Sequence, residues 1–358
     1  MSTPSSTPKP GKTEPKTVPA MRAPAVERDN PLTRSFAGML GIGFLVLMIA
    51  SCVLTLPWTL GAAGGQEGAS VPRYNAGNPE EGRLPPFWWP ADDLQTERIE
   101  AIAETTGQTP RPWLGTDVLG RSLLTRILTG GGISLGIGIA AAFISVFIGT
   151  LYGGLAGYVG GKTDAVLMRI VDVLYGLPYI LLVVLLAVAS EALVQRWIAS
   201  SGVEIKESRR LLLDVGTLLL AIGGVSWLTM ARVIRGQVLS LKEQPFVEAA
   251  KATGATPLRI FTKHLLPNLL GPIIVYATLT VPQAILQESF LSFLGIGVKP
   301  PLPSWGNLAA DGLAELNTYR SHWWLLLFPC LLLGVTLLAL NFVGEGLREA
   351  FDPKRARR

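Results

Sequence analysis

Residues 132–158 read GISLGIGIAAAFISVFIGTLYGGLAGY, and no side chain in this stretch carries a charge. A transmembrane helix needs about 20 predominantly apolar residues to cross the ~30 Å hydrocarbon core of a bilayer. The stretch is therefore long enough to span a membrane. Small residues recur in it every four positions, on one helical face, and such faces let membrane helices pack closely: Ala141, Ser145, Gly149, Gly153 and Gly157.

Five further apolar runs of similar length lie outside this stretch, at about 36–60, 166–190, 211–231, 269–291 and 323–343. Six such runs in one chain argue against a soluble core. The composition agrees, because 49% of the 358 residues are apolar and only 16% are charged, against about 25% charged in soluble domains. We predict an all-α integral membrane protein with about six transmembrane helices.

Residue counts disfavour several other classes of protein. Two cysteines, Cys52 and Cys330, cannot build a disulfide framework. Two histidines, His264 and His322, cannot supply a multi-histidine metal site, so we expect no bound metal. The net charge of +5 is modest and no dense basic tract occurs, so we expect no nucleic-acid partner.

The placement of Lys and Arg predicts the orientation, because cytoplasmic loops carry an excess of these residues. With six spans both termini share one side of the membrane, and that side carries 19 of the 31 Lys and Arg residues. We therefore expect both termini in the cytoplasm. The cluster Lys206, Arg209 and Arg210 falls on the opposite side and counts against this orientation.

The predicted organisation follows from these spans. Residues 1–33 are rich in Ser, Thr, Pro and Lys, a composition typical of a disordered tail. Residues 34–60 form the first transmembrane helix and 61–131 an external insertion. Residues 132–346 form a core with five transmembrane helices, and 347–358 form a cytoplasmic tail.

The external insertion contains Trp88, Trp89 and Trp113, which suit a membrane interface, where an apolar ring meets a wet edge. Stacking on a ligand is the alternative. A short helix is expected at about 94–106. At the inner end of the third span, Asp172 and Arg169 are expected to form a local i,i+3 pair.

The cytoplasmic loop at 244–268 carries clear local signals. Pro245 can start a helix that runs through Glu248, Ala249 and Ala250. Gly254 can end this helix, because glycine adopts the left-handed C-terminal conformation without steric cost.

A second short helix follows in the same loop. Thr256 can cap it, with Pro257 at its first position, and we expect it to stop near Pro267. Its predicted apolar face consists of Leu258, Phe261 and Leu265. Two short helices joined by a sharp turn indicate either an amphipathic surface element or a docking element for a cytoplasmic protein.

Residues 156–163 read AGYVGGKT and nearly match the phosphate-binding pattern G-x-x-x-x-G-K-[ST]. That motif works where a short strand turns into a helix whose N-terminus receives phosphate. Here a long apolar run precedes it. We interpret it as a tight turn between two spans, and we expect that the chain does not hydrolyse ATP itself.

Several motifs together resemble the permease subunits of ABC importers. Glu-Ala-Ala at 248–250, a glycine six positions after the glutamate, and Leu-Pro at 266–267 are similar to the EAA loop of these permeases. Other segments resemble the branch of dipeptide, oligopeptide and nickel importers: WLGTDVLGR at 113–121, AGYVGG at 156–161 before Asp164, ESFLSFLG at 288–295, PLPSWG at 301–306, NFVGEGLR at 341–348 and FDP at 351–353. The resemblance covers about residue 110 to the C-terminus, plus the first span.

The resemblance implies a type I ABC-importer permease-like core with cytoplasmic coupling helices in the bacterial inner membrane. The chain would pair with a second homologous permease above two cytoplasmic ATPase subunits, which bind ATP and Mg, while this chain binds no cofactor and catalyses no reaction. An extracytoplasmic solute-binding protein would deliver di- or oligopeptides. The implied ATPase-coupling residues are Glu248, Ala249, Ala250, Gly254, His264, Pro267 and Asn268.

Glu288 is the acidic residue deepest in a predicted span. Ionisable groups at mid-helix cost about 2.5–3.5 kcal/mol on insertion scales. We expect Glu288 to line the pathway or face the interface between permeases or, if it lies near the outer end, to reach water.

Other functions stay open at this point. Within the family, import of nickel, a sugar or an antibiotic peptide is an alternative, because substrate choice rests largely with the binding protein. An ion-coupled secondary carrier would show internal repeats and paired intramembrane charges, which the sequence does not show. A membrane enzyme would need a nucleophile or a metal cluster at membrane depth, and two scattered histidines do not provide one.

Overall fold

Long apolar helices dominate the computed structural model, which describes residues 36–64, 70–201, 207–317 and 321–350. Within these residues six helices are long and apolar enough to cross a membrane, which confirms the predicted fold class. They are α2 (Phe36–Thr59), α4 (Leu123–Val159), α6 (Tyr179–Ser201), α7 (Glu207–Leu241), α10 (Leu266–Phe293) and α12 (Trp324–Ala350). The predicted tail at 1–33 lies outside the described residues, as do residues 351–358.

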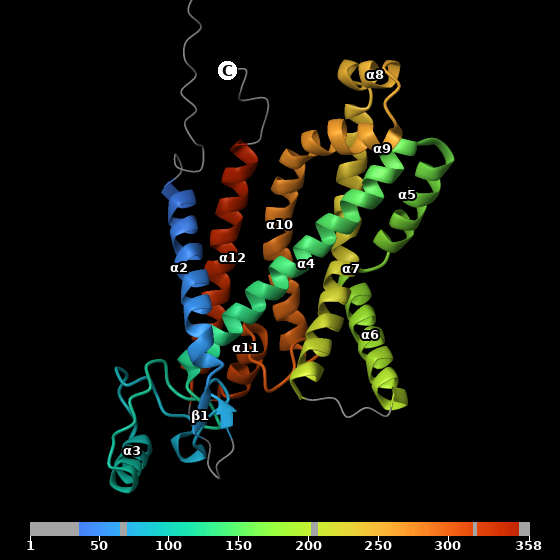
Figure 1. The fold of residues 1–358 in the computed structure, drawn as a ribbon. Helices are drawn as coiled ribbons and strands as arrows, with labels where there is room; N and C mark the ends of the chain where they lie inside the picture. The colour runs from blue at the N-terminus through green and yellow to red at the C-terminus, as the bar shows by residue number, and fades with distance from the viewer. Residues whose placement is uncertain (1–35, 65–69, 202–206, 318–320, 351–358) are drawn as a thin grey trace, which may run out of the picture.

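Helix α4 crosses the molecule obliquely and packs against α7 (Figure 1). The small residues predicted to form a packing face lie at this contact. A Cβ atom added to Gly149 or Gly153 would collide with Met230 or Ala231 of α7. Inside a bilayer, helices associate through close packing because lipid removes the hydrophobic drive between them. The glycines therefore allow α4 to lie directly on α7.

The third predicted span, at 166–190, is wrong as a single helix. The structure has two helices there, α5 (Gly161–Tyr175) and α6, separated by a break at 176–178. Pro178 explains the break, because proline has no N–H to donate and pushes the preceding residue out of the helical region. The fourth span, predicted at 211–231, is also longer than expected and runs through α7 from Glu207 to Leu241.

Two ion pairs join α5 to α7. Arg235 Nε and Nη2 donate to the two carboxylate oxygens of Asp164 at 2.5 and 2.6 Å. Arg232 Nη2 donates to Asp172 Oδ1 at 2.8 Å. The predicted pair of Asp172 with Arg169 is therefore replaced by a pair between helices, because the packing of α5 on α7 brings a second arginine within reach.

The segment between α2 and α4 forms a small folded unit. Its elements are the antiparallel strands β1 (Ala62–Gly64) and β2 (Ser70–Pro72), the 3₁₀ turn η2 (Pro79–Glu81) and the helix α3 (Asp93–Thr106), which matches the helix predicted at 94–106. A capping box starts α3, because Asp92 and Gln95 each accept a hydrogen bond from the other's backbone N–H.

The two predicted faces of the protein lie at opposite ends of the helix bundle. The unit that contains α3 lies at one end, together with α11 (Trp305–Ala314), as Figure 1 shows. The helix α8 (Pro245–Ala252) lies at the other end, where α2 begins and α12 ends. This arrangement agrees with an even number of crossings between Phe36 and Ala350.

Candidate functional site

The first candidate site is the 244–268 loop. Its first helix, α8, starts at Pro245 as predicted. Val247 and Ala250 are buried against a cluster that includes Met230 and Ile234 of α7. Glu248 and Ala249 face away from this cluster and are exposed. The helix is thus held to the membrane core by one face, and its other face is exposed.

Gly254 forms the bend after α8. Its φ of +76° lies in the left-handed region, and its N–H donates to Lys251 O at 3.0 Å. A Cβ atom built on it would meet nothing within 4 Å. Glycine is required here by the backbone conformation, since side chains resist positive φ, and not by a lack of space.

The second half of the loop differs from the prediction. Thr256 caps α9 (Pro257–Ile260) by accepting a hydrogen bond from Arg259 N–H at 3.4 Å. The chain then passes through a π-helical turn, η3 (Phe261–Leu265), directly into α10. The predicted stop near Pro267 is wrong, because the wider turn accommodates a residue without an N–H and the helix continues.

The sequence-predicted coupling residues fall into two groups. Glu248, Ala249, Gly254, Pro267 and Asn268 are exposed, whereas His264 is half-buried and Ala250 is buried. The predicted apolar face of the second helix is only partly correct. Leu265 is buried, but Leu258 is 72% exposed and Ile260 takes its place in the core.

The second candidate site is a cavity of about 460 Å³ between the α5–α6 break, α7 and α10. Its polar side chains include Tyr179, Ser226, Thr229, Thr280, Gln283 and Gln287, and none of the described residues that line it is charged. Tyr179 Oη donates to Gln287 Oε1 at 2.9 Å and shares a hydrogen bond of 3.0 Å with Ser226 Oγ. The tyrosine therefore connects three helices at the wall of the cavity.

Sequence reasoning missed this cavity. A signal was present in α10, where Tyr276, Thr280, Gln283 and Gln287 follow each other at helical spacing on one face. The apolar run around them concealed that face. The α5–α6 break, which lines the cavity with Tyr179, was not predicted at all.

Glu288 does not reach water. Its side chain is fully buried, and Ser292 Oγ donates to it at 2.7 Å. Ser292 Oγ also accepts a hydrogen bond from Val298 N–H at 2.9 Å. Glu288 therefore organises the turn that follows α10. In this conformation it presents no surface to a pathway or a partner, so a role at either site stays a prediction.

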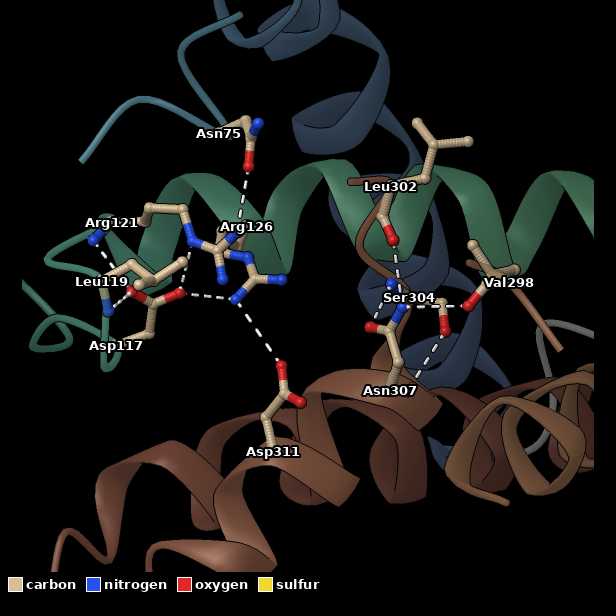
Figure 2. Close-up of polar contacts among 10 residues, drawn as sticks. All are labelled: Asn75, Asp117, Leu119, Arg121, Arg126, Val298, Leu302, Ser304, Asn307 and Asp311. Atoms are coloured by element: carbon tan, nitrogen blue, oxygen red, sulfur yellow. Dashed lines mark hydrogen bonds and ion pairs between the residues drawn. The ribbon is translucent and has the colours of Figure 1, made fainter. Parts of the chain in front are cut away.

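A charged cluster at the opposite end of the molecule from α8 was not predicted as a cluster. Asp117 accepts hydrogen bonds from Arg121 Nε at 2.7 Å and from Arg126 Nη1 at 2.6 Å (Figure 2). Asp311 of α11 lies 3.7 Å from Arg126. Arg121 also donates to Asn75 Oδ1 at 2.9 Å. The cluster joins the unit before α4 to α4 and α11.

Comparison with known proteins gives these sites a context. Residues 149–357 match the family model described as binding-protein-dependent transport system inner membrane component. The chain belongs to this family. The match includes the 244–268 loop and every element that lines the cavity, and it confirms the family predicted from the motifs.

Relatives of this inner membrane component share extended similarity with it. The dipeptide transport system permease protein DppC of Bacillus subtilis is 46% identical over 245 residues, which cover 68% of this chain and 69% of that protein. The oligopeptide transport system permease protein OppC of Escherichia coli is 49% identical over 242 residues, 68% of this chain and 72% of that protein. OppC of Haemophilus influenzae is 46% identical over 242 residues, 68% and 70% of the two chains.

A solved structure is similar as well. The inward-facing MetNI methionine ABC transporter aligns with a TM-score of 0.46 and 20% identity, over 64% of this chain and 98% of that chain.

Proposed function

We propose that this inner membrane component is a type I ABC-importer permease that forms, with a second homologous permease, the translocation pathway for di- or oligopeptides. The observation that carries the proposal is the identity of 46–49% to dipeptide and oligopeptide permeases over two thirds of the chain. Two cytoplasmic ATPase subunits supply the energy, with ATP and Mg bound by them. An extracytoplasmic solute-binding protein delivers the peptide.

The 244–268 loop suits the task of receiving force from an ATPase. Glu248 offers a negative charge at the exposed face of α8, and Phe246 and Leu258 add apolar surface that is 39% and 72% exposed. These three residues would form the contact with the ATPase. Phe246 and Glu248 lie on α8 and Leu258 on α9, so this contact would combine apolar area with a charge that orients the partner.

Motion of the loop would reach the cavity through α10. The helix α9, the π-helical turn and α10 follow one another without a break. A displacement of Pro257 would therefore move α10 as well. Val247 and Ala250 tie α8 to α7 at the same time. Two of the helices that line the cavity, α7 and α10, are therefore the two that the loop holds, which favours a cavity that opens and closes with the ATPases.

The test is purification and reconstitution of the tagged protein from its native membranes. We expect a homologous permease and ATPases to copurify, and the complex in proteoliposomes with a loaded binding protein to accumulate labelled peptide when ATP is supplied. Uptake that requires an ion gradient and not ATP would overturn the proposal in favour of a secondary carrier. ATP-driven uptake of nickel or a sugar, with no peptide uptake, would overturn the substrate class.

A further inference from the structure

The cavity wall on α10 is unusual for a helix inside a membrane. Thr280 and Gln287 are half-buried and Gln283 is exposed within the isolated chain. Within the described part of the chain, the Gln283 amide forms no hydrogen bond. Amide groups left without partners in lipid cost several kcal/mol each. This face of α10 must therefore meet water, a substrate or another polar surface.

Gln287 is held in a defined position. Its Oε1 accepts the hydrogen bond from Tyr179, so its amide N–H groups are the donors left for another molecule. Tyr179 is placed by the start of α6 and by Ser226, whose Oγ lies 3.0 Å from Tyr179 Oη and donates the hydrogen bond between them, because the tyrosine proton goes to Gln287. The glutamine is thus preorganised from two sides, which lowers the entropy cost of binding.

None of the described residues that line the cavity is charged, although charged groups lie close by. Arg232 stacks over the ring of Tyr175, which lines the cavity, at 4.0 Å, and its charge is paired with Asp172. At an effective dielectric constant of 20, an unpaired charge 4 Å from a substrate charge changes its energy by about 4 kcal/mol. A neutral wall avoids that bias between acidic and basic substrates.

Primary amides match the chemistry of a peptide bond, because each has one carbonyl acceptor and an N–H donor at similar spacing. The volume of about 460 Å³ lies within the usual range of small-ligand pockets, about 300–1,000 Å³. We propose that Gln283 and Gln287, the latter positioned by Tyr179, bind the main-chain amides of a peptide in transit, so that this subunit selects for peptide bonds and ignores side-chain charge. The inference rests on the proposed peptide transport.

The first experiment compares substrates in the reconstituted, ATP-driven transporter, with uptake normalised to the amount of each peptide loaded on the binding protein. Tripeptides with a central Lys, Glu or Ala should be taken up within about twofold of each other. An analogue in which an ester replaces one peptide bond should be slower by roughly fivefold, as expected for one lost hydrogen bond. Equal uptake of the ester and the amide would overturn the inference.

The second experiment uses variants. Gln283→Leu with Gln287→Leu should slow amide peptides and abolish the difference from the ester, while Leu286→Ala, an exposed neighbour outside the cavity lining, should change neither. Tyr179→Phe should reduce the difference in uptake between the amide peptide and its ester analogue to half or less, and its expression should be unchanged. Gln283→Glu should create a preference for the Lys peptide over the Glu peptide of about tenfold.

Three results separate the possible failures. If Gln283→Glu produces no charge preference, the side chain does not face the substrate and the inference is wrong. If the leucine variants lose the second permease on purification, the face of α10 that carries Gln283 and Gln287 is a subunit interface and the inference is again wrong. If the unaltered complex transports no peptide at all, the proposed function itself has failed.

Discussion

Arg83 and Glu315 are 232 residues apart in the chain, yet their side chains form a bidentate ion pair, with Nε–Oε2 at 2.7 Å and Nη2–Oε1 at 3.0 Å. Arg83 has a positive φ of 61°, and its N–H donates to Asp117 O at 2.9 Å. His322 Nδ1 lies 3.2 Å from the same Glu315 carboxylate. This group connects the unit before α4 to the segment between α11 and α12.

The Arg83–Glu315–His322 group predicts how pH affects this connection. The hydrogen bond from Arg83 lowers the pKa of Glu315 below its ordinary 4.5, and burial lowers the pKa of His322 below 6.5. For both groups the detached state binds more protons than the folded state, so stability is lost as pH falls. The His322 contribution is lost first, starting near pH 6.5, and the Glu315 contribution below pH 4.5.

We expect the protection of amides in residues 70–122 against hydrogen exchange, after correction for the intrinsic exchange rate at each pH, to fall between pH 7.5 and 5.5. The control is His322→Phe, which keeps an aromatic ring beside Trp324 and removes the titration. The variant should show a flatter pH profile. An unchanged profile in His322→Phe would assign the effect to another group.

Gly254→Val should uncouple transport from ATP hydrolysis. A residue with a side chain in the left-handed region costs about 1–2 kcal/mol, and a β-branched one more, so the bend between α8 and α9 would relax. Gly254→Asn is the matched control, because asparagine tolerates this conformation and nothing within 4 Å blocks a Cβ atom. The measurement is peptide imported per ATP hydrolysed by assembled complexes, and wild-type coupling in the valine variant would refute the prediction.

Asp117→Ala should destabilise the protein far more than Asp311→Ala. Arg126 is buried and depends on Asp117 at 2.6 Å, whereas Asp311 lies at 3.7 Å with a side chain that is 59% exposed. Removing one partner of a buried pair costs about 3–5 kcal/mol, and an exposed pair contributes about 0–1 kcal/mol. Denaturant unfolding in detergent measures both variants, and equal midpoints would contradict this ranking.

Trp88 and Trp89 should lie at the lipid interface, as the sequence suggested. Their rings are about half exposed and contact Trp323, one residue before α12 begins, with centroids 6.4 and 4.9 Å away. The start of a membrane helix sets the depth of Trp323, and interfacial tryptophans gather at that depth. In bilayers with brominated lipid, the variant with both Trp88→Phe and Trp89→Phe should lose part of the quenchable fluorescence. Undiminished quenching would place these rings away from lipid.

Glu288→Gln and Glu288→Leu distinguish a structural role from a transport role. The glutamine oxygen still accepts from Ser292, so stability should change little. The leucine leaves Ser292 and Ser289 without this acceptor, which costs about 1–3 kcal/mol for each buried group that stays unpaired. Thermal unfolding gives the first readout and peptide uptake the second. A Glu288→Gln protein that is stable but no longer transports peptide would indicate that Glu288 acts in the translocation pathway.

Local patterns predicted much of the first candidate site, the 244–268 loop, but not the cavity. Proline and glycine signals correctly located the start of α8 at Pro245 and the bend at Gly254, because both depend on the backbone preferences of single residues. The same reasoning failed at Pro267, where we predicted that the helix stops. A π-helical turn before α10 accommodates the residue without an N–H, and the helix continues. The reasoning also failed at Asp172, because an intrahelical partner and a partner on α7 cannot be distinguished from spacing alone.

By itself the amino-acid sequence determined that this is a helical membrane protein with six spans, a family-specific loop between the fourth and fifth spans, and a close-packing face on α4. These features depend on helix length, apolar composition and residue size, which are properties of one segment at a time. Only the tertiary structure decided that Tyr179 reaches Gln287, that Arg83 pairs with Glu315 and that Glu288 is enclosed by serines. Such contacts depend on how distant helices cross, and crossing is set by the packing of the whole bundle.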